Sequence, residues 1–165
     1  MNASAFRYLY EYHFTENRRV WEECVMPLSH EQFTQKATYS LGSVRDQVIH
    51  LVDVEETWFS ELRGVQSSEP LPAASHDDRS DLRARWDRVE QGMREYLAHL
   101  RDEMLFATPI TEPAEDMGLI TWQVLLHVVN HATDHRAQLL RLLHDLGVKT
   151  TSQDLIFYVY DHPQA

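Results

Sequence analysis

The chain has 165 residues with four Trp, seven Tyr and six Phe, so it can bury a core as one domain over 1–165 without disulfides. Its one cysteine excludes a cysteine-based zinc site and suits a reducing compartment, and its net charge of −11 argues against a nucleic-acid partner. Residues 1–20 lack a secretory signal and no stretch approaches the roughly 20 apolar residues that cross a bilayer, so we expect a cytoplasmic protein with no membrane partner.

Helical patterns begin close to the start of the sequence. Apolar residues recur at spacings of three and four across residues 3–25, which predicts a first long helix, and Pro27 ends it. Ser29 and Gln32 stand in the positions of a capping box. We therefore expect a short helix at about 29–34 after the first long one.

The next segment reads as a second long helix followed by a linker. Ser43 is suited to cap the helix start, the apolar line continues to Leu62, and Gly64 is suited to end the helix. The composition of residues 65–76 is that of a surface linker.

The remainder predicts two more long helices with an irregular segment between them. The third helix is expected over about 77–104 and the fourth over about 121–146, with Gly147 after it. Residues 105–120 are expected to be extended chain, as a short hairpin or a loop. Residues 155–160 are β-branched and aromatic, which leaves helix and strand both open. Four long helices predict an all-α fold, with an antiparallel bundle as the default.

Three histidines lie four residues apart in the fourth predicted helix: His127, His131 and His135. Successive steps of four residues drift only about 40° around a helix, so two such imidazoles can close on one cation. His131 and His135 fall on core-facing positions, where unpartnered imidazoles would cost a few kcal/mol each. Hydrogen bonds to buried polar groups or a bound metal would remove that cost, and the pair favours a metal.

A third ligand is available from the second predicted helix. His50 precedes the buried position Leu51 and can complete a three-histidine site that leaves coordination positions open. His127 has three possible roles: replacing His135 in the chelating pair, contacting a ligand from outside, or lining the mouth of the site.

Several other residues are weaker candidates. Glu55 or Glu56 could orient a ligand or act as a base, although glutamates on helices are usually only solvated. His13 could make an outer contact to the site. Arg136 and Gln138 are expected at a helix–helix contact or against the first helix.

Motifs of other metal proteins are absent from the sequence. It contains no Glu-x-x-His, which the paired sites of di-iron bundles require, and no His-Glu-x-x-His of zinc proteases. Four stretches instead match a known family in the right order: LSHEQF at 28–33, the segment 41–64, HVVNHATDHRAQ within 127–147, and SQDLIFYV at 152–159. On these stretches the chain resembles the DinB/YfiT-like superfamily of DinB-like metalloenzymes.

The resemblance implies an up-down-down-up four-helix bundle with a short C-terminal element. It also implies one divalent metal, such as Zn, Ni or Fe, held by His50, His131 and His135. Relatives often form homodimers, and some use low-molecular-weight thiols to transfer or isomerise small-molecule substrates. The family often has Gly two residues after the last ligand, where this chain has Ala137, a better helix former.

Three hypotheses about function follow. The first is a metal-dependent enzyme of the thiol-transferase, isomerase or hydrolase type, in which the ion activates a thiol or water. The second is a non-catalytic, metal-binding dimeric module associated with stress. The third is an ordinary bundle whose histidines are merely hydrogen-bonded.

Overall fold

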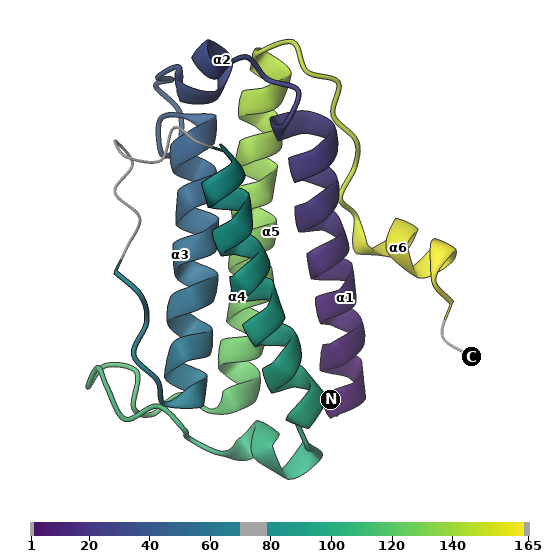
Figure 1. Ribbon diagram of the computed structural model, residues 1–165. Helices are drawn as coiled ribbons and strands as arrows, with labels where there is room; N and C mark the ends of the chain where they lie inside the picture. The colour runs from purple at the N-terminus through teal and green to yellow at the C-terminus, as the bar shows by residue number, and fades with distance from the viewer. Residues whose placement is uncertain (1, 70–78, 164–165) are drawn as a thin grey trace.

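The computed structural model describes residues 2–69 and 79–163, and every regular element in these ranges is helical. This finding confirms the all-α prediction. The predicted linker 65–76 and the predicted start of the third helix at residue 77 fall partly outside the described residues. Four long helices lie side by side (Figure 1): α1 (Ala3–Val20), α3 (Val44–Arg63), α4 (Arg79–His99) and α5 (Thr121–Asp145).

The direction of the long helices confirms the up-down-down-up order. In Figure 1, α1 runs upward, α3 and α4 both run downward, and α5 returns upward. Helix α3 packs against both α4 and α5, and α1 packs against α4 and α5. Because α3 and α5 are neighbours, side chains on their facing surfaces can meet to form a site.

Capping side chains fix the ends of the elements around α3. The short helix α2 (His30–Thr34) begins at a complete capping box formed by Ser29 and Gln32, as predicted. Helix α3 begins where Ser43 Oγ accepts the backbone N–H of Asp46 at 3.0 Å. It ends at Gly64, whose φ of +63° is easily adopted only without a Cβ. The local sequence therefore sets the bounds of the helix that carries His50.

The first predicted helix is two elements. Helix α1 ends at Val20, and the chain continues as a π-helix, η1 (Trp21–Val25), in which Met26 N–H donates to Trp21 O at 2.9 Å. The prediction of continuous helical chain to residue 25 is confirmed, and the change to the wider π turn was not predicted.

The prediction that the third helix extends to residue 104 is wrong. Helix α4 ends at His99, and a separate 3-10 helix, η3 (Asp102–Phe106), follows. Arg7 of α1 donates to the carbonyl oxygens of Leu97 at 3.2 Å and Leu100 at 3.0 Å. These hydrogen bonds help satisfy the carbonyl groups left at the end of α4, where the chain leaves the helix.

The last two helices complete the fold. Helix α5 begins at Thr121, as predicted, and Gly147 follows its end with a φ of +81°. Residues 155–160 are helical, within α6 (Leu155–Asp161), which lies outside the bundle beside α1 in Figure 1. None of the helices in the described part of the chain combines the length and apolar content needed to cross a membrane.

Large apolar side chains from all four long helices fill the interior. Each such side chain stabilises the folded state by about 1.5–3 kcal/mol when it leaves water. Helices α3 and α5 are therefore held in fixed positions by packing that does not involve His50, His131 or His135. Fully buried members of this core are Phe6, Tyr10, Leu51, Phe59, Leu82, Met93, Leu125 and Leu139.

Candidate metal centre

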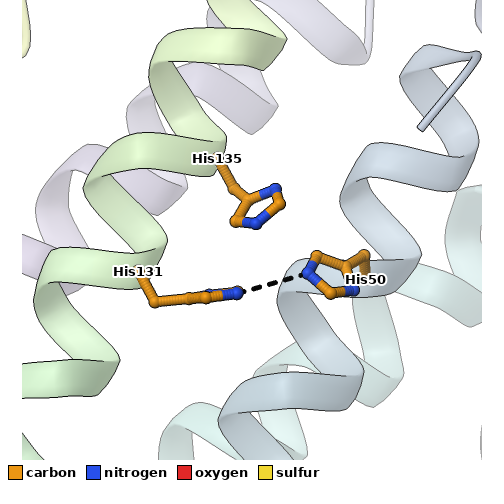
Figure 2. Close-up of side chains that lie close together, drawn as sticks. All are labelled: His50, His131 and His135. Atoms are coloured by element: carbon orange, nitrogen blue, oxygen red, sulfur yellow. Dashed lines mark hydrogen bonds between the residues drawn. The ribbon is translucent and has the colours of Figure 1, made fainter. Parts of the chain in front are cut away.

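Three histidine side chains meet at the contact between α3 and α5. His50 comes from α3, and His131 and His135 come from successive turns of α5; Figure 2 shows their rings converging on one point. One ligand atom from each lies within 4.8 Å of the other two. Within the described ranges, this is the one group of three or more His, Cys, Asp or Glu residues that could hold a metal ion. The structure therefore brings together the three residues that the sequence singled out.

The separation of the first two histidines fits a shared ion. The Nε2 atoms of His50 and His131 lie 3.3 Å apart. Two nitrogens bound to zinc at a tetrahedral angle would lie about 3.3–3.4 Å apart, because each Zn–N bond is about 2.0–2.1 Å long. The ring centroid of His135 is 4.3 Å from that of His131 and 4.4 Å from that of His50. Neutral imidazoles at these positions are a donor set suited to Zn, Ni or Fe.

A hydrogen bond is the other way to satisfy this pair. One neutral imidazole can donate through Nε2 while the other accepts, and the dashed line in Figure 2 marks that contact. This bond accounts for two of the three rings. In the same view, one nitrogen of His135 is directed toward the pair, so a hydrogen bond between His50 and His131 leaves the convergence of the third ring unexplained.

All three histidines favour the neutral form that binds metals. Burial lowers the pKa of His131 to about 4, with the neighbouring histidines adding to the effect. Burial also lowers the pKa of His50, helped by the proximity of His135, and burial lowers the pKa of His135 itself. A neutral ring keeps a lone pair for an ion, so protons do not compete strongly for these nitrogens at pH 7.

His127 lies outside the group of three. It is exposed, one turn before His131 on α5, with its ring centroid 5.6 Å from that of His131. Its other neighbour is Trp58 of α3, at 5.1 Å between ring centroids. Of the three roles considered for His127, a place at the mouth of the site is the one that this position supports.

The two glutamates considered as bases point away from the histidines. Glu55 is only 2% exposed, although helix glutamates are usually solvated. It lies five residues after His50, about 140° around the helix, and so faces the interior. Glu56 instead forms an ion pair with Arg85 of α4 at 2.8 Å. Neither carboxylate belongs to the group of three histidines.

Glu55 is the centre of a buried polar cluster. Its carboxylate accepts from Asn17 Nδ2 at 2.9 Å and Trp86 Nε1 at 2.8 Å, and it lies 3.1 Å from His13 Nε2. Burial raises the pKa of Glu55, but hydrogen bonds from His13, Trp86 and Asn17 outweigh it, so the pKa lies below its usual value. Asn17 and Trp86 were not identified from the sequence, because their partner lies on a third helix.

His13 and Arg136 extend this cluster between α1 and α5. Arg136 Nη1 lies 3.1 Å from His13 Nδ1 and donates to Asn17 Oδ1 at 2.7 Å. Because a guanidinium can only donate, His13 accepts through Nδ1 and carries its proton on Nε2, facing Glu55. Burial lowers the pKa of His13, which keeps the ring neutral. The prediction that Arg136 packs against the first helix is confirmed. His13 lies in the interior and does not belong to the group of His50, His131 and His135.

One polar neighbour of the three histidines was missed. Gln47, one turn before His50 on α3, is fully buried, and its Nε2 lies 2.7 Å from His135 Nδ1 and 3.1 Å from His135 O. A polar residue three positions before His50, on the same helix face, is the signal that could have identified it. Gln138 contacts Ser40, in the segment before α3, and not the first helix.

The fold and the group of three histidines can be compared with known proteins. A search of curated proteins finds no match to this chain. A sequence model described as the DinB family matches residues 1–164, a range that contains His50, His131 and His135. The resemblance noted in the sequence is thereby confirmed, and the chain belongs to the DinB family.

Proposed function

We propose that this protein binds one divalent metal ion through His50, His131 and His135 and acts as a metal-dependent enzyme on a small molecule. The observation that carries the proposal is the convergence of three neutral imidazoles from two helices, with the Nε2 atoms of His50 and His131 3.3 Å apart. Zn, Ni and Fe all suit this donor set. When bound, such an ion would act as a Lewis acid and make a thiol or a water more acidic near neutral pH.

The chain's own residues would hold the ion and leave one side open. All three histidines are half-buried, so the group lies near the surface of the contact between α3 and α5 and not in the apolar core. Helices α3 and α5 are fixed by apolar packing on their other faces, which keeps the three rings in register. Trp58 and His127 would form an aromatic wall beside the opening, against which a small apolar group can pack.

A thiol-dependent transfer or isomerisation, or a hydrolysis, is the proposed reaction class. The chain belongs to the DinB family. The resemblance noted in the sequence supports this reaction class, because it implies that some relatives use low-molecular-weight thiols. The net charge of −11 favours a small-molecule partner over a nucleic acid. We also propose a cytoplasmic location, as expected from the sequence.

The enzyme proposal is tested by a rate measurement. Metal-loaded protein is incubated with small electrophiles, with and without several low-molecular-weight thiols, and also with ester and amide substrates. A rate that needs both the metal and the three histidines supports the proposal, and His144→Ala, an exposed residue of α5, is the control that should keep the rate. Full metal loading without turnover of any substrate would favour the non-catalytic alternative.

That alternative is a metal-binding homodimer without activity. A group of exposed apolar side chains on α6 favours association of two copies, because such a patch is often an interaction surface. Light scattering of the protein with metal and with a chelator tests it: a dimer of twice 19.4 kDa is expected, and a monomer at all concentrations would contradict it. The patch consists of Leu155 (39% exposed), Ile156 (48%), Phe157 (51%) and Tyr160 (70%).

A further inference from the structure

Gln47 joins α3 to one of the three histidines of α5. Its side-chain amide is fully buried and lies 2.7 Å from His135 Nδ1. We propose that Gln47 is a positioning residue for His135: its carbonyl oxygen accepts the Nδ1–H of the ring and thereby leaves the Nε2 lone pair free for an ion. The role in metal binding rests on the proposed function, whereas the position of the proton does not.

The position of a single proton decides whether His135 can be a ligand. A neutral imidazole carries one N–H, on Nδ1 or on Nε2. If the NH₂ group of Gln47 faces Nδ1, the proton must be on Nε2, directed at His50 and His131 (Figure 2). If the carbonyl oxygen of Gln47 faces Nδ1, the proton is on Nδ1 and Nε2 is free. Turning an amide by 180° exchanges its O and N with little change in shape, so both arrangements fit the same space.

Ser40 distinguishes between the two orientations of Gln47. Its hydroxyl has one hydrogen but contacts the Oε1 atoms of both Gln47, at 2.9 Å, and Gln138. The orientation of Gln138 is fixed, because its NH₂ group donates to the carboxylate of Asp134 at 2.9 Å. Ser40 can therefore donate to Gln138 and accept from Gln47 only if Gln47 presents its NH₂ group to Ser40.

The turned amide gives a chain in which each link has one donor and one acceptor. His135 Nδ1–H donates to Gln47, Gln47 donates to Ser40, and Ser40 donates to Gln138. The contact given up is that of Gln47 with His135 O at 3.1 Å, a carbonyl that already accepts a hydrogen bond inside helix α5. Before the amide is turned, Gln47 Oε1 faces Ser40 Oγ at 2.9 Å without a hydrogen between them when Ser40 donates to Gln138. After it is turned, Gln47 Oε1 faces His135 O at 3.1 Å, so the two unpaired oxygens lie farther apart.

The backbone at Ser40 supports the same network. Ser40 has a φ of +51°, in the left-handed region that residues with a Cβ seldom adopt. The hydrogen bonds that its hydroxyl makes to Gln47 and Gln138 join the segment before α3 to both helices. The strained residue is thus part of the chain of hydrogen bonds that ends at His135.

Two variants of Gln47 test the proposal through metal affinity. Gln47→Met removes the acceptor, and Gln47→Glu keeps an acceptor that cannot turn into a donor. Zn²⁺ and Co²⁺ affinities are measured by competition with a chromophoric chelator, together with the Co²⁺ absorption spectrum. We expect Gln47→Met to weaken binding by about 10–100-fold and Gln47→Glu to remain close to the native chain. Equal affinities for the native chain and Gln47→Met would overturn the proposal.

A second measurement does not depend on metal binding. Long-range ¹H–¹⁵N NMR of the metal-free native protein reports which nitrogen of His135 carries the proton, and we expect Nδ1. A proton on Nε2 would overturn the proposal. If the native chain binds no metal but the proton is on Nδ1, the proposed function fails and the role of Gln47 stands.

Ser40→Gly keeps the test usable if Gln47→Met does not fold. Glycine suits the φ of +51°, and the substitution removes the small CH₂OH side chain and with it the hydroxyl, on the surface side of the network. We expect part of the His135 proton to move to Nε2 and the Zn²⁺ affinity to fall by a few-fold. An unchanged proton position and affinity in Ser40→Gly would contradict the hydrogen-bond chain.

Discussion

The Nε2 atoms of His50 and His131 lie 3.3 Å apart although the residues are 81 positions apart in the chain. This separation equals the one expected for two imidazoles on a shared tetrahedral ion. It is set by α3 and α5, whose packing against the rest of the bundle does not depend on the histidines. The folded chain itself therefore brings these two nitrogens to a separation that an ion could bridge, with a ligand atom of His135 within 4.8 Å of both.

Metal addition should stabilise the native fold. An ion that binds only the folded state at 100 times its Kd adds about 2.7 kcal/mol to the free energy of unfolding, which raises the Tm by roughly 5–10 °C for a chain of this size. Thermal unfolding with Zn²⁺ and with excess chelator measures the shift. His131→Ala should abolish the shift and His144→Ala should keep it; an equal shift in both variants would show that the ion binds elsewhere.

Glu55 is expected to matter for stability and not for metal binding. Glu55→Ala leaves the N–H groups of Asn17 and Trp86 without their acceptor and should lower the free energy of unfolding by about 3–5 kcal/mol. Glu55→Gln should lower the free energy of unfolding by less, because its amide keeps one oxygen that can accept a hydrogen bond. Urea denaturation and metal content of the folded protein are measured together. Loss of metal from a well-folded Glu55→Gln variant would instead assign this residue to the metal site.

His13 should make the protein less stable as the pH falls. Burial holds its pKa in the folded state below its usual value, and Glu55 and Arg136 flank the ring. Between the unfolded-state pKa of about 6.5 and the lower folded-state pKa, the unfolded chain binds one more proton, so stability falls by up to about 1.4 kcal/mol per pH unit.

The contribution of His13 is isolated by comparison with His13→Gln. Both metal-free proteins are unfolded with urea from pH 7.5 to pH 5. The free energy of unfolding should fall less steeply with pH in the variant, and the difference in slope should correspond to about one proton. Parallel declines would mean that His13 titrates normally in the folded protein. Above pH 7 the free energies of unfolding of the native chain and His13→Gln should differ by a constant amount.

The cap of α3 should contribute to stability without changing the site. Ser43→Ala removes the acceptor for Asp46 N–H and should lower the free energy of unfolding by about 1 kcal/mol, whereas Ser43→Asp should retain most of the stability. Chemical denaturation provides the measurement. Metal content should remain that of the native chain in both variants, and its loss in Ser43→Ala alone would show that the start of α3 directly orders His50.

The sequence predicted the three-histidine group better than its surroundings. Spacing alone brings His131 and His135 onto one face of a helix, since helical periodicity is a local property. His50 was a candidate third ligand from its place beside a buried position of the second helix. That its helix is the neighbour of α5 came only from the resemblance, because no local rule specifies which helices pack together. The contacts of Gln47 and Glu55 depend on that same tertiary packing, and neither side chain was predicted from the sequence to be fully buried.

The errors in the fold also have tertiary causes. The third helix was predicted to extend to residue 104, but α4 ends at His99, where Arg7, about 90 positions earlier, donates to the carbonyls of Leu97 and Leu100. A contact over that sequence distance leaves no trace in the local pattern. The helix α6 could not be distinguished from a strand, because its β-branched and aromatic residues favour strands and its start lacks a side-chain cap.

The most direct test of the metal centre is elemental analysis of protein purified without chelators or affinity metals. The native chain is compared with His50→Ala, His131→Ala and His135→Ala, and with His144→Ala as the control. The structure predicts about one equivalent of a divalent metal in the native chain and in His144→Ala, and its loss in each of the other three. Metal far below one equivalent in the native chain, even after incubation with Zn²⁺, Ni²⁺ or Fe²⁺, would contradict the account.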